Sequence, residues 1–87
     1  MIKLGKMEDA LSFIQKAMTI DRQIGRQYGF AHNKQLMATI HEQAKNYSQA
    51  YNLICEARAI FVRLNSGKEI EADYERIKKK YESQQFT

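Results

Sequence analysis

Proline is absent from this 87-residue chain, and cysteine occurs only once. With one cysteine no disulfide can form within the chain, and the apolar neighbours of Cys55 predict a buried, unreactive thiol. No apolar run approaches the roughly 18 residues of a membrane-spanning helix, and no signal-peptide segment opens the chain. With 44% hydrophobic and 28% charged residues, the composition predicts a soluble helical domain in the cytoplasm.

The excess of basic over acidic residues is also small. The net charge is only +4, and the basic residues are scattered along the chain. A nucleic-acid-binding domain usually carries a clustered basic stripe instead. The one basic run, Lys78-Lys79-Lys80, would fan over about 200° of a helix rather than form one patch. We therefore interpret it as a solvated helix end, with nucleic-acid binding as the alternative.

Motifs of enzymes and metal sites are missing: there is no His-Glu-x-x-His, Cys-x-x-Cys, glycine-rich phosphate loop or Gly-x-Ser-x-Gly. His32 and His41 lie nine residues apart, about 180° around a helix, so one helix cannot aim both at a metal. Acidic residues gather near one predicted helix start, where the helix dipole favours them: Glu69, Glu71, Asp73 and Glu75. The sequence predicts no catalytic residue, no metal and no cofactor.

Alanine occurs in pairs seven residues apart, which is two helical turns. The pairs are Ala10 and Ala17, Ala31 and Ala38, and Ala50 and Ala57. Each pair marks a stripe where a neighbouring backbone can come close. The first pair recurs as the third after 40 residues, and Ile14→Ile54 and Ile20→Ile60 share this offset. An internal repeat of helices is typical of a solenoid, which usually presents a surface to a partner.

Apolar periodicity predicts four helices, over about residues 7–24, 27–44, 47–64 and 67–84. Gly25 is placed to end the first of them. Asn46, with Gln49 three residues later, and Ser66, with Glu69, are predicted to cap the third and fourth through their side chains.

Two segments of this pattern resemble the tetratricopeptide repeat. Asn46-Tyr47-Ser48-Gln49-Ala50, with Ile54 and Ala57, is similar to the turn and second helix (helix B) of that motif. Gly5-Lys6-Met7-Glu8-Asp9-Ala10, with Ile14 and Ala17, is similar to the same part of a preceding copy.

The other two helices resemble the first helix (helix A) of the motif. Within residues 27–44, Met37 and Ala38 take the family's Leu and small positions, while His41 and Lys34 replace its Tyr and large aromatic. His41 is therefore expected to be a packed residue and not a catalytic one. In the last helix Tyr74, Ile77 and Tyr81 match the pattern, but Lys78 stands at the small position, which suggests a C-terminal capping helix.

This resemblance implies an all-α fold of about four helices, with antiparallel hairpins stacked as a short right-handed solenoid. Residues 6–25 would be helix B of a partial repeat, 27–64 one full repeat, and 67–84 the capping helix. The 40-residue period is longer than the common one of about 34, and armadillo and HEAT repeats remain alternatives.

The family's function implies a non-catalytic scaffold that binds a peptide or protein partner in a groove lined by A helices. Carried over by position, the lining residues are His32, Gln35, Thr39, Glu42, Glu75, Lys79 and Glu82. The lining is polar and lacks the lysine- and asparagine-rich pattern of members that bind chaperone tails. The alternative function is a small helical regulatory domain associated with nucleic acid through its basic residues.

The segment Met1-Ile2-Lys3-Leu4-Gly5-Lys6 resembles the final turn of a helix A whose body is absent. The helix that follows carries more apolar residues than one packed face requires, namely Leu11, Phe13, Ile14, Met18 and Ile20. We expect either the rest of a longer array or a second copy of the chain to cover them. Phe13 and Met18 are the predicted self-association residues.

Overall fold

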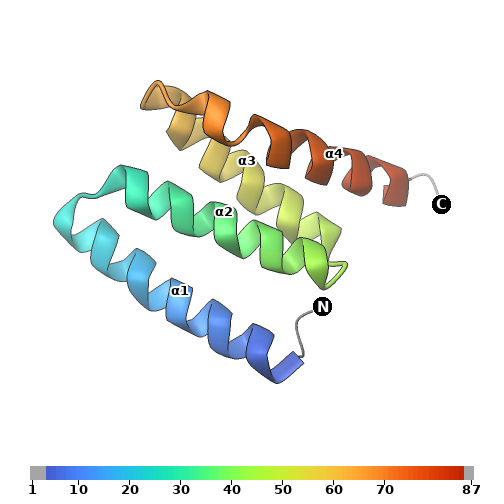
Figure 1. The fold of residues 1–87 in the computed structure, drawn as a ribbon, viewed down its shortest axis with the longest axis horizontal. Coiled ribbons are helices and arrows are strands. Elements are labelled where there is room, and N and C mark those ends of the chain that lie inside the picture. Colours follow the sequence, from blue (N-terminus) through green and yellow to red (C-terminus); the bar gives the residue numbers. More distant parts are fainter. Residues whose placement is uncertain (1–3, 86–87) are drawn as a thin grey trace.

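A computed structural model describes residues 4–85 and shows an all-α fold (Figure 1). Its elements are α1 (Leu4–Ile24), α2 (Gln27–Gln43), α3 (Tyr47–Arg63), the 3-10 turn η1 (Gly67–Glu69) and α4 (Glu71–Gln85). Consecutive helices pack against one another as hairpins, and the Cα atoms fill a slab of 42 × 32 × 16 Å. The predicted all-α stack of helical hairpins is confirmed.

Two predicted helix starts differ from the structure. The first helix begins at Leu4, so Leu4–Lys6 belong to α1 and are not the end of a preceding helix. Residues 1–3 of that predicted turn lie outside the described residues. The last helix begins at Glu71, because the backbone first forms the short 3-10 turn η1. None of the helices in the described part of the chain is both long and apolar enough to cross a bilayer.

All three turns between helices end the preceding helix in the same way. Gly25, Lys45 and Asn65 adopt left-handed backbone conformations, with φ of 77°, 64° and 60°. The N–H of the next residue then bonds back to the last turn, as Asn46 does to the His41 carbonyl at 2.8 Å and Ser66 to that of Phe61 at 2.7 Å. This pattern is the Schellman motif, and it satisfies carbonyls that the helix end leaves free.

The same motif explains why two predicted caps are wrong. Neither Asn46 nor Ser66 makes a side-chain capping hydrogen bond to the helix or turn that follows it. Both backbones are already fixed by the preceding helix, and the Ser66 hydroxyl lies 3.5 Å from the carbonyl of Leu64 instead. The Gly25 prediction is confirmed, since that residue has the positive φ that glycine accommodates most easily.

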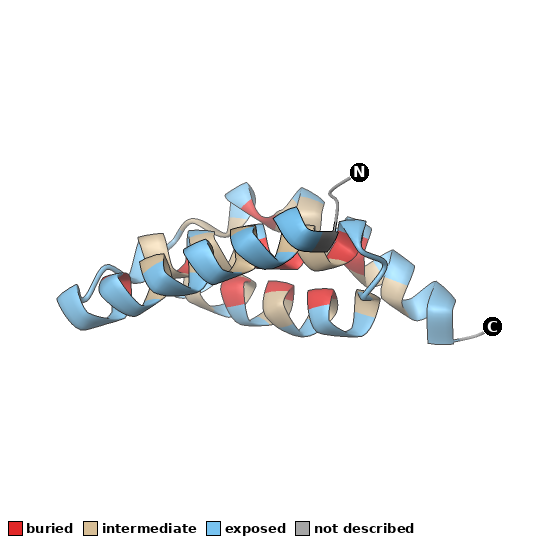
Figure 2. Ribbon diagram, turned by 90° about the horizontal axis from the view of Figure 1, so that it is seen from below, coloured by how far each residue is buried: buried red, intermediate tan, exposed pale blue. Residues whose placement is uncertain are grey.

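The core lies where α2, α3 and α4 meet. Its fully buried residues are Ala31, Ala38, Ala50, Ile54, Ala57, Phe61, Ile70 and Ile77. The two central alanine pairs have no exposed surface, which confirms that their stripes are helix contacts. Ala10 and Ala17 of α1 are only half-buried, and α1, nearest the viewer in Figure 2, is mostly exposed.

Enlarging Ala50 is expected to overpack this contact. The Ala50→Leu variant should lose roughly 1–3 kcal/mol in free energy of unfolding, because the residue has no exposed surface into which a larger side chain could turn. Urea unfolding followed by circular dichroism measures this loss, with the exposed Ser83→Leu as the control. Equal midpoints for the two variants would contradict a tight contact at Ala50.

Gly29 lies at a close approach between α1 and α2. A Cβ at this position would lie 2.9 Å from a carboxylate oxygen of Asp21. Asp21 is buried, and its carboxylate accepts a hydrogen bond from the Asn33 side chain at 3.0 Å. The glycine thus sits inside a helix because a buried carboxylate needs the space.

Candidate protein-binding site

Two of the predicted groove residues lie in a polar network that joins α2 to α4. The side chain of Gln35 donates to Asp73 at 2.7 Å, and Asp73 accepts from Arg76 at 2.8 Å. Arg76 also binds both carboxylate oxygens of Glu42, at 2.7 and 2.8 Å. Lys80 donates to the same carboxylate at 2.8 Å. The sequence analysis singled out Gln35 and Glu42 but missed Arg76 and Lys80.

Glu42 is the electrostatic centre of this network. It is only 6% exposed, whereas the side chains of Arg76 and Lys80 are almost half exposed. The hydrogen bonds from Arg76 hold the pKa of Glu42 below its usual range, against the opposing effect of burial. The same contact raises the pKa of Arg76. Glu42 is thus a charged residue that fastens α4 to α2, and its oxygens are already occupied.

The other predicted groove residues are placed differently. Thr39 is half-buried and donates its hydroxyl to the Gln35 carbonyl at 3.1 Å. His32, Glu75 and Lys79 are exposed, as is Glu82. The structure therefore leaves these polar side chains of α2 and α4 exposed, outside the hydrogen-bonded network of Gln35, Glu42, Asp73, Arg76 and Lys80.

His41 is half-buried, in agreement with a packing role. Its Nδ1 atom is buried and has no hydrogen-bond partner among the described residues. Burial lowers the pKa of His41 from its ordinary value of 6.5, because the charged imidazolium loses solvation. The unprotonated imidazole is therefore favoured near neutral pH. Within residues 4–85, no three His, Cys, Asp or Glu side chains are grouped to hold a metal ion.

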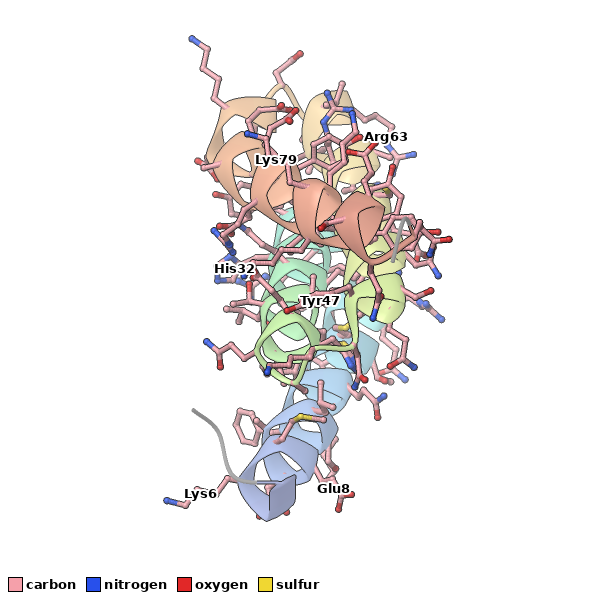
Figure 3. All side chains as sticks on the ribbon, turned by 90° about the vertical axis from the view of Figure 1, so that its right-hand side faces the viewer. Lys6, Glu8, His32, Tyr47, Arg63 and Lys79 are labelled. Carbon is pink, nitrogen blue, oxygen red and sulfur yellow. The ribbon has the colours of Figure 1, made fainter. Side chains whose placement is uncertain are left out.

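Large apolar side chains line one exposed edge of α1. Phe13, Ile20 and Ile24, which we call the α1 stripe, are 75%, 56% and 60% exposed. Lys6 lies seven residues before Phe13, so both project from the same side of the helix. Figure 3 shows Lys6 and His32 projecting to the same side of the slab. The α1 stripe therefore faces the side on which α2 presents His32.

Met18, the second predicted self-association residue, lies elsewhere on α1. It is half-buried and lines an open cavity of about 350 Å³ together with Phe30, Met37 and Leu53. Its side chain is thus turned toward α2 and α3. Phe13 and Met18 do not form one surface in this structure, although they share a helix.

The basic run in α4 is largely engaged within the chain. Lys80 binds Glu42, and the Lys78 ammonium lies 5.9 Å from the centre of the Tyr74 ring. Lys79 is exposed. The three lysines therefore do not present one basic surface, which weakens the nucleic-acid alternative.

Cys55 is half-buried, whereas the sequence predicted a buried residue. It follows the core residue Ile54 in α3 and lies one helical turn after Tyr51. Tyr51 of α3 stacks on Tyr81 of α4 at 4.6 Å between ring centres.

Comparisons with known proteins add no assignment to this geometry. No family model matches the chain, and neither a curated protein nor a solved structure shows significant similarity to it.

Proposed function

We propose that this chain is a non-catalytic protein–protein interaction module of the tetratricopeptide type. The 40-residue offset between α1 and α3 and the buried alanine contacts support the repeat interpretation. The exposed α1 stripe carries the functional proposal, because clustered large apolar side chains on a protein surface usually mark an interface. The partner that the stripe fits best is a second copy of the chain.

The spacing of the stripe supports this choice of partner. The half-buried Ala17 lies between the residues of the α1 stripe on the same side of the helix. Positions 13, 17, 20 and 24 are therefore separated by 4, 3 and 4 residues, a spacing that is the same in both chain directions. An antiparallel copy related by a two-fold axis therefore places Phe13 opposite the second copy's Ile24. Ala17 then faces the second copy's Ile20, and a small residue meets a large one on both sides. The stripe is self-complementary.

Sedimentation equilibrium over a range of protein concentrations tests this proposal. The wild-type chain is expected to form a species heavier than the 10.2 kDa monomer. Phe13→Glu should shift the equilibrium toward monomer, because a charge would be buried at the contact. The matched control is Val62→Glu, which alters an exposed apolar residue of α3 outside the stripe. A wild-type monomer at high concentration, or equal shifts in both variants, would contradict the proposed dimer.

A further inference from the structure

A second surface lies at the opposite side of the molecule from His32, near Arg63 (Figure 3). An open cavity of about 310 Å³ occurs where the end of α1, the start of α2 and the end of α3 meet. The arginines among its lining residues are Arg22, Arg26 and Arg63. Its apolar lining comes from Phe30 and Ile60.

The positive charge at this cavity is only partly compensated. Among the described residues that line the cavity, Asp21 is the one acidic residue, and its carboxylate oxygen lies 4.0 Å from Nε of Arg26. The Arg26 side chain is mostly exposed. Arg22 lies over the face of Phe30, 5.2 Å from the ring centre. Arg63 makes no ion pair or hydrogen bond with the described residues. Three positive charges and one negative charge therefore surround the opening.

Helix dipoles alone do not account for this arrangement. Arg22 and Arg63 lie in the last turns of α1 and α3, where a basic residue stabilises the helix end. That effect acts on each helix separately and requires no common cavity. The packing of α1 and α3 on α2 brings the two residues to the same opening although 41 positions separate them in the sequence.

A second cavity with a mixed polar and apolar lining borders this one. Arg22 and Phe30 also line the cavity of about 350 Å³ that contains Met18, Met37 and Leu53. The two cavities are therefore adjacent along α2, between α1 and α3, and the arginines surround the first of them. We call the two cavities together the arginine groove.

We propose that the arginine groove binds an acidic segment of a protein partner, in which carboxylate side chains alternate with large apolar ones. The guanidinium groups match the planar carboxylate, to which arginine can donate two parallel hydrogen bonds. Phe30, Met37 and Leu53 supply the apolar contact that a protein segment offers and a phosphate backbone does not. This binding surface is separate from the α1 stripe and does not depend on self-association.

A nucleic acid is less suited to this groove. Phosphate groups along a duplex require basic side chains spread along the backbone, whereas these arginines converge on one cavity that Phe30 and Ile60 also line.

Peptide titration into the 15N-labelled full chain, followed by NMR chemical shifts, tests the proposal. The probe is acetyl-Glu-Phe-Glu-Leu-amide, and its neutral twin carries Gln in place of each Glu. We expect saturable shifts in the acidic titration for the amides of Gly25, Gln27, Phe30 and Ile60, and at least fivefold weaker binding of the neutral twin. Absence of saturable shifts at millimolar peptide, or equal binding of both peptides, would overturn the proposal.

Three variants distinguish binding at the arginine groove from a general effect of the positive charge of the chain. Arg63→Gln and Arg26→Gln should each weaken binding of the acidic peptide about fivefold, since each removes one charge-assisted contact. Lys79→Gln removes the same charge from α4 and should change the affinity less than twofold. Circular dichroism should show the same helicity in all three variants, because these side chains are exposed. An equal loss in Lys79→Gln, or tighter binding of a 12-base-pair duplex than of the peptide, would also overturn it.

Discussion

Replacing Phe61 by alanine is expected to lower the free energy of unfolding by about 3–5 kcal/mol. Phe61 is the largest fully buried side chain of the described residues. Its ring packs edge-to-face with that of Tyr28, with 5.4 Å between the ring centres. The loss combines apolar surface returned to water with a cavity that rigid helices cannot fill. Because small domains are stable by only about 5–15 kcal/mol, this substitution removes a large part of the total.

Phe13→Ala is the matched control, since it makes the same chemical change on an exposed residue. Its effect on urea unfolding should stay within about 0.5 kcal/mol at concentrations where the chain is monomeric. If Phe61→Ala does not fold, Phe61→Leu should still unfold at a lower urea concentration than the wild type. Equal stability of Phe61→Ala and Phe13→Ala would show that Phe61 is not at the core.

The helices and the central contact were predictable because they depend on local order in the sequence. The seven-residue spacing of Ala31 and Ala38, and of Ala50 and Ala57, depends only on helical geometry, and the structure buries all four. A positive φ at Gly25 was predictable from its chemistry. The tetratricopeptide assignment stays a prediction.

The turns after α2 and α3 were missed because their left-handed residues are not glycine. Lys45 and Asn65 adopt positive φ because the Schellman bonds of the two helix ends require it. Asn46 and Ser66 were predicted to cap the following element because asparagine and serine are preferred residues at helix N-caps. In this fold their backbone N–H groups close the preceding helix instead.

The site depends on contacts between distant residues, and sequence spacing does not reveal these. Glu42 is 34 positions from Arg76 in the sequence. The periodicity of α2 predicts that Glu42 lines a groove, but it does not predict which residue of another helix binds its carboxylate. The available signal was the spacing of Arg76 and Lys80 in α4. They lie one helical turn apart, so both can reach the same acidic group on a neighbouring helix. The arginine groove likewise requires knowing how α1 and α3 lie on α2.

The network around Glu42 should make the stability of the fold depend on pH. Since the pKa of Glu42 is lower in the folded chain than its ordinary value of 4.5, the unfolded chain binds the proton more tightly. The stabilisation is therefore complete above about pH 4.5 and is lost as the pH falls through the folded pKa. Burial of His41 adds a separate decrease in stability as the pH falls below about 6.5.

Glu42→Gln isolates the contribution of the carboxylate. At pH 7 the variant should be less stable than the wild type by about 2 kcal/mol, because it loses charge-assisted bonds from Arg76 and Lys80. This difference should shrink toward zero in acid, where the wild-type carboxyl is also uncharged, while the His41 contribution remains in both proteins. Urea unfolding at pH 7 and at acidic pH measures it. Glu75→Gln, an exposed substitution on α4, should stay within about 0.5 kcal/mol of wild type. A difference for Glu42→Gln that persists unchanged in acid would mean that side-chain shape, and not the carboxylate charge, fastens α4 to α2.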